Sequence, residues 1–306
     1  MYSSKTLNGL LSLLWSGVNF AARRFSSPVK LTARRVISVG NLQVGGAGKT
    51  PLVALIAKEA NTRGLSVCIL TRGYRGEWEK DGGILFPKDL ADPRLCGDEA
   101  ALLREEVPEA WIAVGRNRVV QYERAKTKIG KEFDLVILDD GFQHFKIARD
   151  LDVIALTSKN SFQIVHRDFK SAVHSDALIV WTKGEIRPIS RPLVHMSYSL
   201  TPGNYPIWLL TGVADPEEVK RSVAKAGYEV KRHLIFSDHA AYDSEHAQSI
   251  LKECILAGCK LALTGKDYVK WKQWIHDPLQ IEVLEPQLTF LEGRELWDGK
   301  LWGASL

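Results

Sequence analysis

The chain has 306 residues, of which 45% are hydrophobic and 25% are charged, and its formal net charge is +5. This is the composition of an ordinary globular protein with one large domain or two modest ones, and it excludes a low-complexity chain. The four cysteines show no C-x-x-C spacing, so neither a disulfide framework nor a zinc site is indicated, and a reducing compartment is expected.

The positive charge is concentrated at the N-terminal end, because no acidic residue precedes Glu59. A basic end of this kind favours an anionic partner, either a membrane surface or a nucleic acid. Basic and aromatic residues do not alternate along the chain, so no nucleic-acid partner is expected.

Residues 1–30 are predicted to form a membrane-associating helix. Apolar side chains recur there at helical spacing, and the segment closes with Arg23–Arg24. The apolar stretch of about 16 residues is shorter than the roughly 20 that span a bilayer. It therefore fits an amphipathic helix in the interface, with residues 1–24 contacting the membrane. A secretory signal peptide and a helix packed on its own domain are the alternatives.

A buried strand at Val36–Val39 leads into a glycine-rich loop formed by Gly45, Gly46, Ala47 and Gly48. Such a loop directs backbone N–H groups at phosphates. Lys49 would reach the β- and γ-phosphates, and the Thr50 hydroxyl would ligate Mg²⁺ at the start of a helix. The usual pattern has a glycine where this chain has Gln43, and a chance Gly-Lys-Thr in an ordinary turn is the alternative. The loop predicts a site for a nucleoside triphosphate.

Strand-like runs then alternate with helical stretches, which predicts an α/β fold: a P-loop nucleotide-binding parallel sheet with helices on both faces. This core is expected over residues 31–184. Four prolines make residues 185–206 the best linker or hinge, and residues 207–306 read as a smaller second α/β lobe. Ligands in such sheets sit at the carboxyl ends of the strands, so a cleft between the two lobes is the natural site.

One apolar strand ends in two carboxylates, Asp139 and Asp140, with Gln143 shortly after. A carboxylate in this position holds Mg²⁺ directly or through water in phosphate-loop proteins. Asp139 is the preferred Mg²⁺ ligand, and Gln143 supplies a neutral oxygen. A plain Asp-Gly turn that ends the strand is the alternative.

Two further groups are candidates for proton transfer. Asp98 opens a helix, where it either complements the helix dipole or takes a proton from an attacking hydroxyl. His239 follows Asp238 at the end of a strand of the second lobe. This pair is either a proton relay or an incidental surface pair.

Arginines follow two strands on the same edge as the phosphate loop. Arg72, Tyr74 and Arg75 follow the second strand, and Arg118 follows the third. Guanidinium groups suit phosphate recognition, so these residues are predicted to bind substrate. Solvated loop charges are the alternative.

Together these motifs resemble those of the tetraacyldisaccharide 4′-kinase family, whose members make lipid IV-A in the lipid A pathway. The resemblance runs from the N-terminal helix to about Lys270, and its specific segments are Val39–Pro51, Arg72–Tyr74, Gly97–Glu99, Asp139–His144 and Asp238–His239. The family does not keep a glycine at the position of Gln43, which accounts for the imperfect loop.

The resemblance implies transfer of the ATP γ-phosphate to the 4′-hydroxyl of a lipid A disaccharide 1-phosphate at the cytoplasmic face of the bacterial inner membrane. It also implies that Asp98 assists deprotonation of the hydroxyl with support from His239. Lys49 and Thr50 would hold the phosphates and Mg²⁺, while Asp139, Asp140 and Gln143 complete the surroundings of the metal and base.

The chain departs from the family pattern in two segments. The family's later Thr-Glu-Lys-Asp motif reads Thr264-Gly265-Lys266-Asp267 here, and the other departure concerns a residue near the metal. The family has a Leu-Pro-Ala-Gly-x-Leu-Arg-Glu segment whose glutamate lies near the metal, and the corresponding place here reads Phe162 to Asp168. Asp168 is therefore expected to replace that glutamate as a shorter acid. A membrane-recruited switch ATPase of the partitioning kind is the alternative function, although its loop carries a lysine where this chain has Val44.

Overall fold

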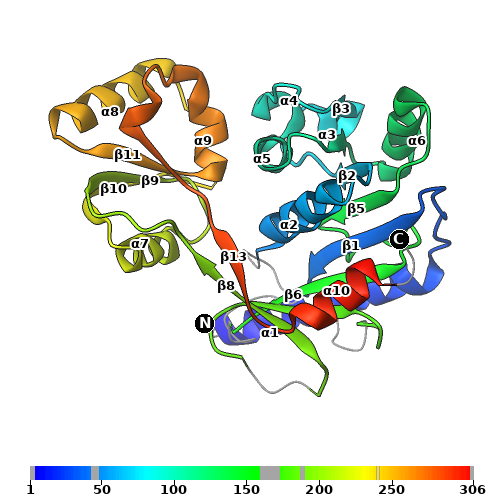
Figure 1. The fold of residues 1–306 in the computed structure, drawn as a ribbon. Helices are drawn as coiled ribbons and strands as arrows, with labels where there is room; N and C mark the ends of the chain where they lie inside the picture. The colour runs from blue at the N-terminus through cyan, green and yellow to red at the C-terminus, as the bar shows by residue number, and fades with distance from the viewer. Residues whose placement is uncertain are drawn as a thin grey trace.

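The computed structural model describes residues 4–42, 48–158, 173–186, 190–238, 240 and 242–303, and for residues 4–10 only the backbone is described. Within these residues the chain forms two α/β lobes, which Figure 1 shows with the first lobe on the right and below and the second at the upper left. The fold class predicted from the sequence is confirmed.

The first lobe is built on a large sheet. Its described strands follow the order β13-β8-β7-β6-β1-β5-β2-β4-β3. The strands from β8 to β4 are parallel, and β13 and β3 are antiparallel edge strands. The strand bounds are β1 Arg35–Asn41, β2 Val67–Thr71, β3 Gly83–Leu85, β4 Trp111–Val114, β5 Leu135–Asp139, β6 Leu151–Thr157, β7 Leu178–Lys183, β8 Leu193–Ser199 and β13 Gln287–Glu292.

Helices cover both faces of this sheet. Every residue of β2 and β5 is buried, as expected for central strands of a covered parallel sheet. One face packs against α2, α5 and α10, and the other against α6. The helix bounds are α2 Lys49–Thr62, α3 Trp78–Asp81, α4 Pro93–Cys96, α5 Asp98–Glu106, α6 Arg118–Ile129 and α10 Arg294–Trp302.

The second lobe has a smaller sheet of parallel strands in the order β10-β9-β11-β12. Helix α8 packs on one side and α7 on the other. Asp215 caps α7 by accepting a hydrogen bond from the Glu218 N–H, and Pro216 occupies the first turn. The bounds are β9 Pro206–Thr211, α7 Pro216–Lys225, β10 Glu229–Ile235, α8 Ser244–Leu256, β11 Lys260–Thr264, α9 Gly265–Trp271, β12 Ile281–Leu284 and the short 3₁₀ turns η2 Lys272–Trp274 and η3 Pro278–Gln280.

The lobe boundaries differ from those expected. Strand β8 lies inside the presumed linker 185–206 and pairs with β7 in the large sheet. The chain then returns from the second lobe through β13, which pairs with β8, and α10 follows it onto the first lobe (Figure 1). Burial explains the return, because Trp297 and Leu301 of α10 are fully buried in the first-lobe core.

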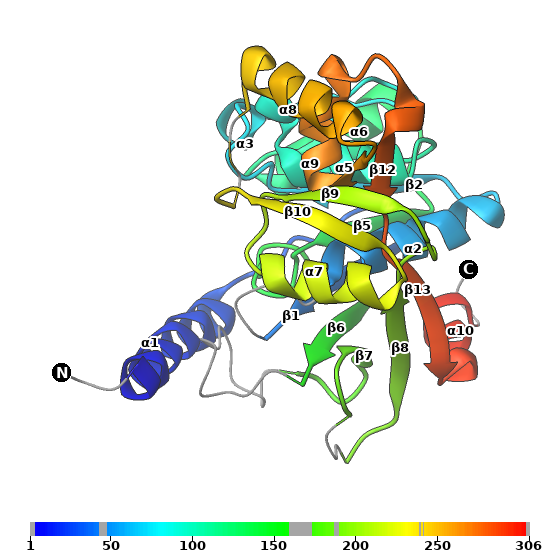
Figure 2. The same ribbon diagram turned by 90° about the vertical axis from the view of Figure 1, so that its left-hand side faces the viewer.

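Helix α1, Ser4–Phe25, extends from the first lobe, as Figure 2 shows. Its polar side faces the protein: Ser16 is 2% exposed, and Ser12, Asn19 and Arg23 are partly buried. Its apolar side is open, with Leu11, Leu13, Leu14, Trp15, Val18, Phe20 and Phe25 all exposed. In the described part of the chain, no helix combines the length and apolar character needed to cross a bilayer.

Candidate active site

The end of the glycine-rich loop is fixed by a tyrosine from a distant strand. Gly48 has the left-handed conformation (φ 72°) that favours glycine, and it precedes the first turn of α2. The buried hydroxyl of Tyr198, on β8, donates a hydrogen bond of 2.9 Å to the Gly48 carbonyl. Burial raises the pKa of this phenol, which keeps it a donor. The predicted loop residues Gly45, Gly46 and Ala47, together with Gln43, lie outside the described residues.

Lys49 lies at the carboxyl edge of the large sheet, as predicted. Its ammonium is 3.5 Å from an oxygen of Asp140 and donates to the Asn41 side-chain oxygen over 3.4 Å. Asn41 is fully buried at the end of β1, and its backbone carbonyl accepts a hydrogen bond of 3.0 Å from Gln143. Thr50 follows Lys49 in the first turn of α2. Four of the predicted groups therefore meet at the N-terminus of one helix, where anions bind.

Asp139 ends β5 directly beside β1, where it pairs in register with Val39. It is 2% exposed, and one of its oxygens accepts a hydrogen bond of 3.0 Å from the Thr71 hydroxyl. Burial, together with the nearby charges of Glu99 and Asp140, raises the pKa of Asp139 to about 7. A buried carboxyl that resists ionisation in this way is a site that a cation would stabilise.

The turn that follows Asp139 has a strained backbone, and a buried arginine stabilises it by hydrogen bonds. Asp140 has a positive φ of 44°, a conformation that residues other than glycine rarely adopt. Arg118 donates to the backbone carbonyl of Asp139 over 2.7 Å and to that of Asp140 over 3.5 Å. Arg118 is itself buried, and burial lowers its pKa from the ordinary value. The structure thus places Arg118 under the turn, where it supports the two carboxylates.

The other predicted arginines surround Glu79 of α3. The Glu79 carboxylate accepts hydrogen bonds from the Arg72 guanidinium (2.8 Å), the Arg116 guanidinium (3.1 Å) and the Arg75 backbone N–H (3.2 Å). Partial burial opposes ionisation, but the hydrogen bonds from Arg116 and Arg75 hold the pKa of Glu79 below its ordinary value. The guanidinium carbons of Arg75 and Arg72 lie 5.5 Å and 5.9 Å from the centroid of the Tyr74 ring. The three arginines and Tyr74 remain exposed to solvent, and the Arg72 and Arg116 side chains share the Glu79 carboxylate.

Asp98 lies where the two lobes contact each other. It begins α5 in the first lobe, and its carboxylate is 3.4 Å from the ammonium of Lys270, on α9 of the second lobe. Beside it, Lys266 of α9 pairs with Glu99 at 3.4 Å. The Arg75 guanidinium is 3.5 Å from the backbone carbonyl of Asp238, which brings the stretch before His239 against the first lobe. His239 itself lies outside the described residues.

The residues present fit a magnesium ion at this edge. Mg²⁺ prefers oxygen ligands and keeps several waters and phosphate oxygens, so one or two protein groups suffice. Asp139 supplies a buried carboxylate whose ionisation a cation would favour. Asp168, the remaining predicted ligand, lies outside the described residues, and the described residues alone contain no cluster of three metal-ligating side chains.

Several residues of the site were not identified from the sequence. Asn41 stands in the Gly-Asn-Leu segment, so its position in a motif could have singled it out. Tyr198 and Lys270 carry no local signal, because each contacts a residue more than a hundred positions away in the sequence. Glu79 contacts two arginines close to it in the sequence as well as the more distant Arg116, and it stands in no motif that would single it out.

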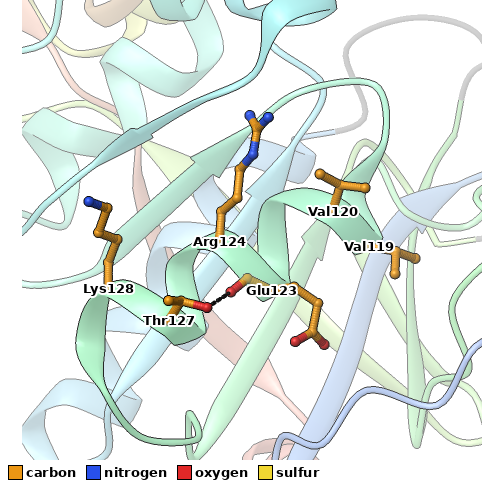
Figure 3. A pocket seen from close by; sticks show the side chains of 6 residues that line it. All are labelled: Val119, Val120, Glu123, Arg124, Thr127 and Lys128. Carbon is orange, nitrogen blue, oxygen red and sulfur yellow. Dashed lines mark hydrogen bonds between the residues drawn. The ribbon is translucent and has the colours of Figure 1, made fainter.

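A separate shallow hollow of about 400 Å³ lies along the outer side of α6 (Figure 3). All of its lining residues come from this one helix: Val119, Val120, Glu123, Arg124, Thr127 and Lys128. The hollow includes none of the predicted site residues, so it is a feature of the helix surface.

Comparison with known proteins gives consistent matches over most of the chain. The model of the family described as tetraacyldisaccharide-1-P 4′-kinase matches residues 7–166 and 174–299. The tetraacyldisaccharide 4′-kinase of Chlorobium phaeovibrioides is 30% identical over 293 residues, covering 82% of this chain and 80% of that protein. The corresponding protein of Geobacter metallireducens is 32% identical over 276 residues, covering 79% of this chain and 80% of that protein.

A solved structure shares the fold. The crystal structure of LpxK from Aquifex aeolicus in complex with ATP superposes with a TM-score of 0.74 at 22% identity, over 97% of this chain and 98% of that chain. The matches do not favour the partitioning-ATPase alternative.

Proposed function

This chain belongs to the tetraacyldisaccharide-1-P 4′-kinase family, and we propose that it transfers the γ-phosphate of ATP to the 4′-hydroxyl of a tetraacyldisaccharide 1-phosphate, giving lipid IV-A. It is a kinase and a transferase of lipid A biosynthesis. The observation that carries the proposal is the meeting of Lys49, Asp140 and Asp139 at the sheet edge, with Asp98 at the contact between the lobes.

The phosphate side of the reaction belongs to the first lobe. The N-terminus of α2 and the Lys49 ammonium attract the triphosphate, since both carry positive charge toward the sheet edge. Lys49 lies between Asp140 and Asn41, which orient its ammonium before any ligand arrives. Preorganised charge of this kind stabilises the transferring phosphoryl group without reorganisation during the step.

The acceptor side uses Asp98. The 4′-oxygen attacks the γ-phosphorus, the bond between that phosphorus and the bridging oxygen of ADP breaks, and the hydroxyl proton passes to the Asp98 carboxylate. His239 supports this proton transfer from the second lobe. Phosphoryl transfer asks the protein mainly for positioning, and the base orients the nucleophile more than it activates it.

Magnesium completes the proposal. Thr50, Asp139, Gln143 and Asp168 would hold the ion against the triphosphate. When bound, it neutralises charge on the phosphate oxygens. Arg72, Arg75 and Tyr74 are proposed to contact the anionic acceptor, because they are exposed to solvent beside the Asp98 helix. Arg118 is proposed to position the turn at Asp139 and Asp140, in place of the substrate contact expected from the sequence.

The transfer is tested with purified protein, labelled ATP, Mg²⁺ and the acceptor lipid in detergent. Asp98→Asn should lose most of the turnover, by roughly a hundredfold or more, while nucleotide affinity stays within about threefold. Glu105→Gln is the matched control, since Glu105 lies on the same helix and pairs with Lys272 away from the site. Failure of the wild-type protein to phosphorylate the lipid at any detergent level would sink the proposal.

We also propose that α1 lies on the cytoplasmic face of the inner membrane, through residues 1–24. The support is its inverted amphipathicity: the apolar side is exposed and the polar side packs on the protein. An exposed apolar stripe flanked by basic residues suits an anionic lipid surface. Neither the hypothesis of a helix packed on its own domain nor that of a signal peptide accounts for an apolar side that faces solvent while the polar side faces the protein.

Binding to anionic vesicles tests this location. Val18→Glu should weaken binding roughly tenfold, because it removes an apolar contact from the exposed side of α1. Leu256→Glu is the control, since Leu256 is 78% exposed at the end of α8, far from α1 in both ribbon views (Figures 1 and 2). Equal vesicle binding by Val18→Glu and the wild type would mean that α1 serves the fold alone.

A further inference from the structure

Lys270 of the second lobe contacts two elements that carry predicted proton-transfer groups. Its ammonium is 3.4 Å from a carboxylate oxygen of Asp98 and donates a hydrogen bond of 3.2 Å to the backbone carbonyl of Ala240. Ala240 directly follows His239 in the chain. One ammonium therefore touches the acid on α5 and the backbone segment that carries the histidine.

The pair is shielded from solvent, unlike its neighbours. The Lys270 and Asp98 side chains are 11% and 13% exposed. Two further lysine–acid pairs join α9 and η2 to α5, and both are more open: Lys266 with Glu99, and Lys272 with Glu105. Solvent screens exposed pairs strongly, so the inner pair fixes its geometry most firmly.

Lys270 is itself held by its surroundings. Asp267, one helical turn earlier, is fully buried and has an oxygen 3.8 Å from the Lys270 ammonium. The oxygens of Asp267 accept hydrogen bonds from the Tyr242 hydroxyl (2.8 Å), the Gly212 N–H (3.0 Å) and the Thr264 hydroxyl (2.7 Å). The Tyr242 ring also lies 5.1 Å from the ammonium. Because these contacts fix the Lys270 ammonium, the ammonium in turn restricts the positions of the Asp98 carboxylate and the Ala240 carbonyl.

We propose that Lys270 is a positioning residue for phosphoryl transfer, which holds the Asp98 carboxylate and the backbone at Ala240 in register across the two lobes. The proposal rests on the proposed function, because it concerns the group predicted to take the proton of the acceptor hydroxyl. Misplacement of a catalytic group by about 1 Å is enough to slow a reaction strongly. The first lobe thus binds the phosphates, while the second lobe aligns the proton acceptor.

The test measures steady-state transfer from labelled ATP to the acceptor lipid by the full chain. Lys270→Met should lower kcat by about tenfold to a hundredfold. This is the change in rate that corresponds to losing the free energy of one charge-assisted hydrogen bond in the transition state. The KM for ATP should change less than about threefold, because the phosphates bind in the first lobe. Lys270→Arg keeps the charge and should recover most of the loss. Lys272→Met, on the same ladder of pairs, should retain kcat within about twofold.

A double-mutant comparison separates positioning from folding. In an Asp98→Asn background, Lys270→Met should cause little further loss, because Lys270 acts through Asp98. Independent effects of the two substitutions, a normal kcat for Lys270→Met, or an equal loss for Lys272→Met would each overturn the role of Lys270 while leaving the kinase function intact. A wild-type protein that transfers no phosphate would instead refute the function, and the role of Lys270 with it.

Discussion

Replacing Asp139 by asparagine should make the metal-free protein more stable at pH 8 while abolishing transfer. The Asp139 carboxyl has a pKa of about 7 in the folded protein, against 3.8 for the ordinary group, mainly because it is buried. The folded state therefore keeps the proton over a pH range in which the unfolded chain has lost it. Stability falls as the pH rises from about 4 to about 7, and the loss is complete above pH 7.

The size of the effect follows from the shift. About three pKa units correspond to roughly 4 kcal/mol, which is an upper limit. Asparagine can still accept the hydrogen bond from the Thr71 hydroxyl, but it no longer attracts the buried Arg118 guanidinium. We therefore expect Asp139→Asn to gain about 1–2 kcal/mol in the free energy of unfolding at pH 8, and clearly less at pH 5.

Urea unfolding in EDTA at pH 5 and pH 8 measures this difference. Asp134→Asn is a control of opposite sign, because hydrogen bonds from the Ser66 side chain and backbone lower the pKa of Asp134. That carboxylate stabilises the folded state above the unfolded pKa, so its replacement should cost stability at pH 8. An Asp139→Asn protein less stable than the wild type at pH 8 would refute the reasoning.

The sequence predicted the parts of the fold that have local signals. Central strands such as β5 are continuous apolar runs, and the strand that ends in Asp139 was therefore placed correctly. Strand β8 was missed because only alternate residues are buried and prolines surround it. The return of β13 and α10 was missed because long-range pairing, not local pattern, determines it.

The same division applies to the site. Lys49 and Asp139 stand in motifs, and the parallel sheet brings their strand ends together. Arg118 was expected to bind substrate because its loop lies on the same sheet edge as the phosphate loop. Only the three-dimensional packing shows that its guanidinium donates to the backbone carbonyl of Asp139. The pairing of Asp98 with Lys270 depends on how α5 and α9 dock, which no spacing in the sequence reveals.

Two further substitutions test other parts of the fold. Gly48→Ala should weaken ATP binding by about tenfold or more in calorimetry, because a Cβ there would lie 1.9 Å from the Tyr198 hydroxyl. Gly130→Ala is the control: Gly130 has a similar φ of 74° but open space around it, so the substitution should cost only backbone strain, about 1 kcal/mol of stability. Arg104→Leu should lower the free energy of unfolding by about 3 kcal/mol in urea, because the buried guanidinium donates to four backbone carbonyls; a loss below 1 kcal/mol would contradict this.

The site collects negative charge where the fold alone would not favour it. Asp139, Asp140 and Glu99 lie close enough that each raises the cost of ionising the buried one, and Asp140 adds a strained backbone. Lys49 offsets this charge from the first lobe, and Lys266 offsets it from the second. A bound cation would relieve the same repulsion, so ATP with Mg²⁺ should stabilise the wild type more at pH 8 than at pH 5. In Asp139→Asn this dependence on pH should largely disappear. The repulsion between the carboxylates destabilises the free protein, and its relief on binding favours nucleotide that carries the metal ion.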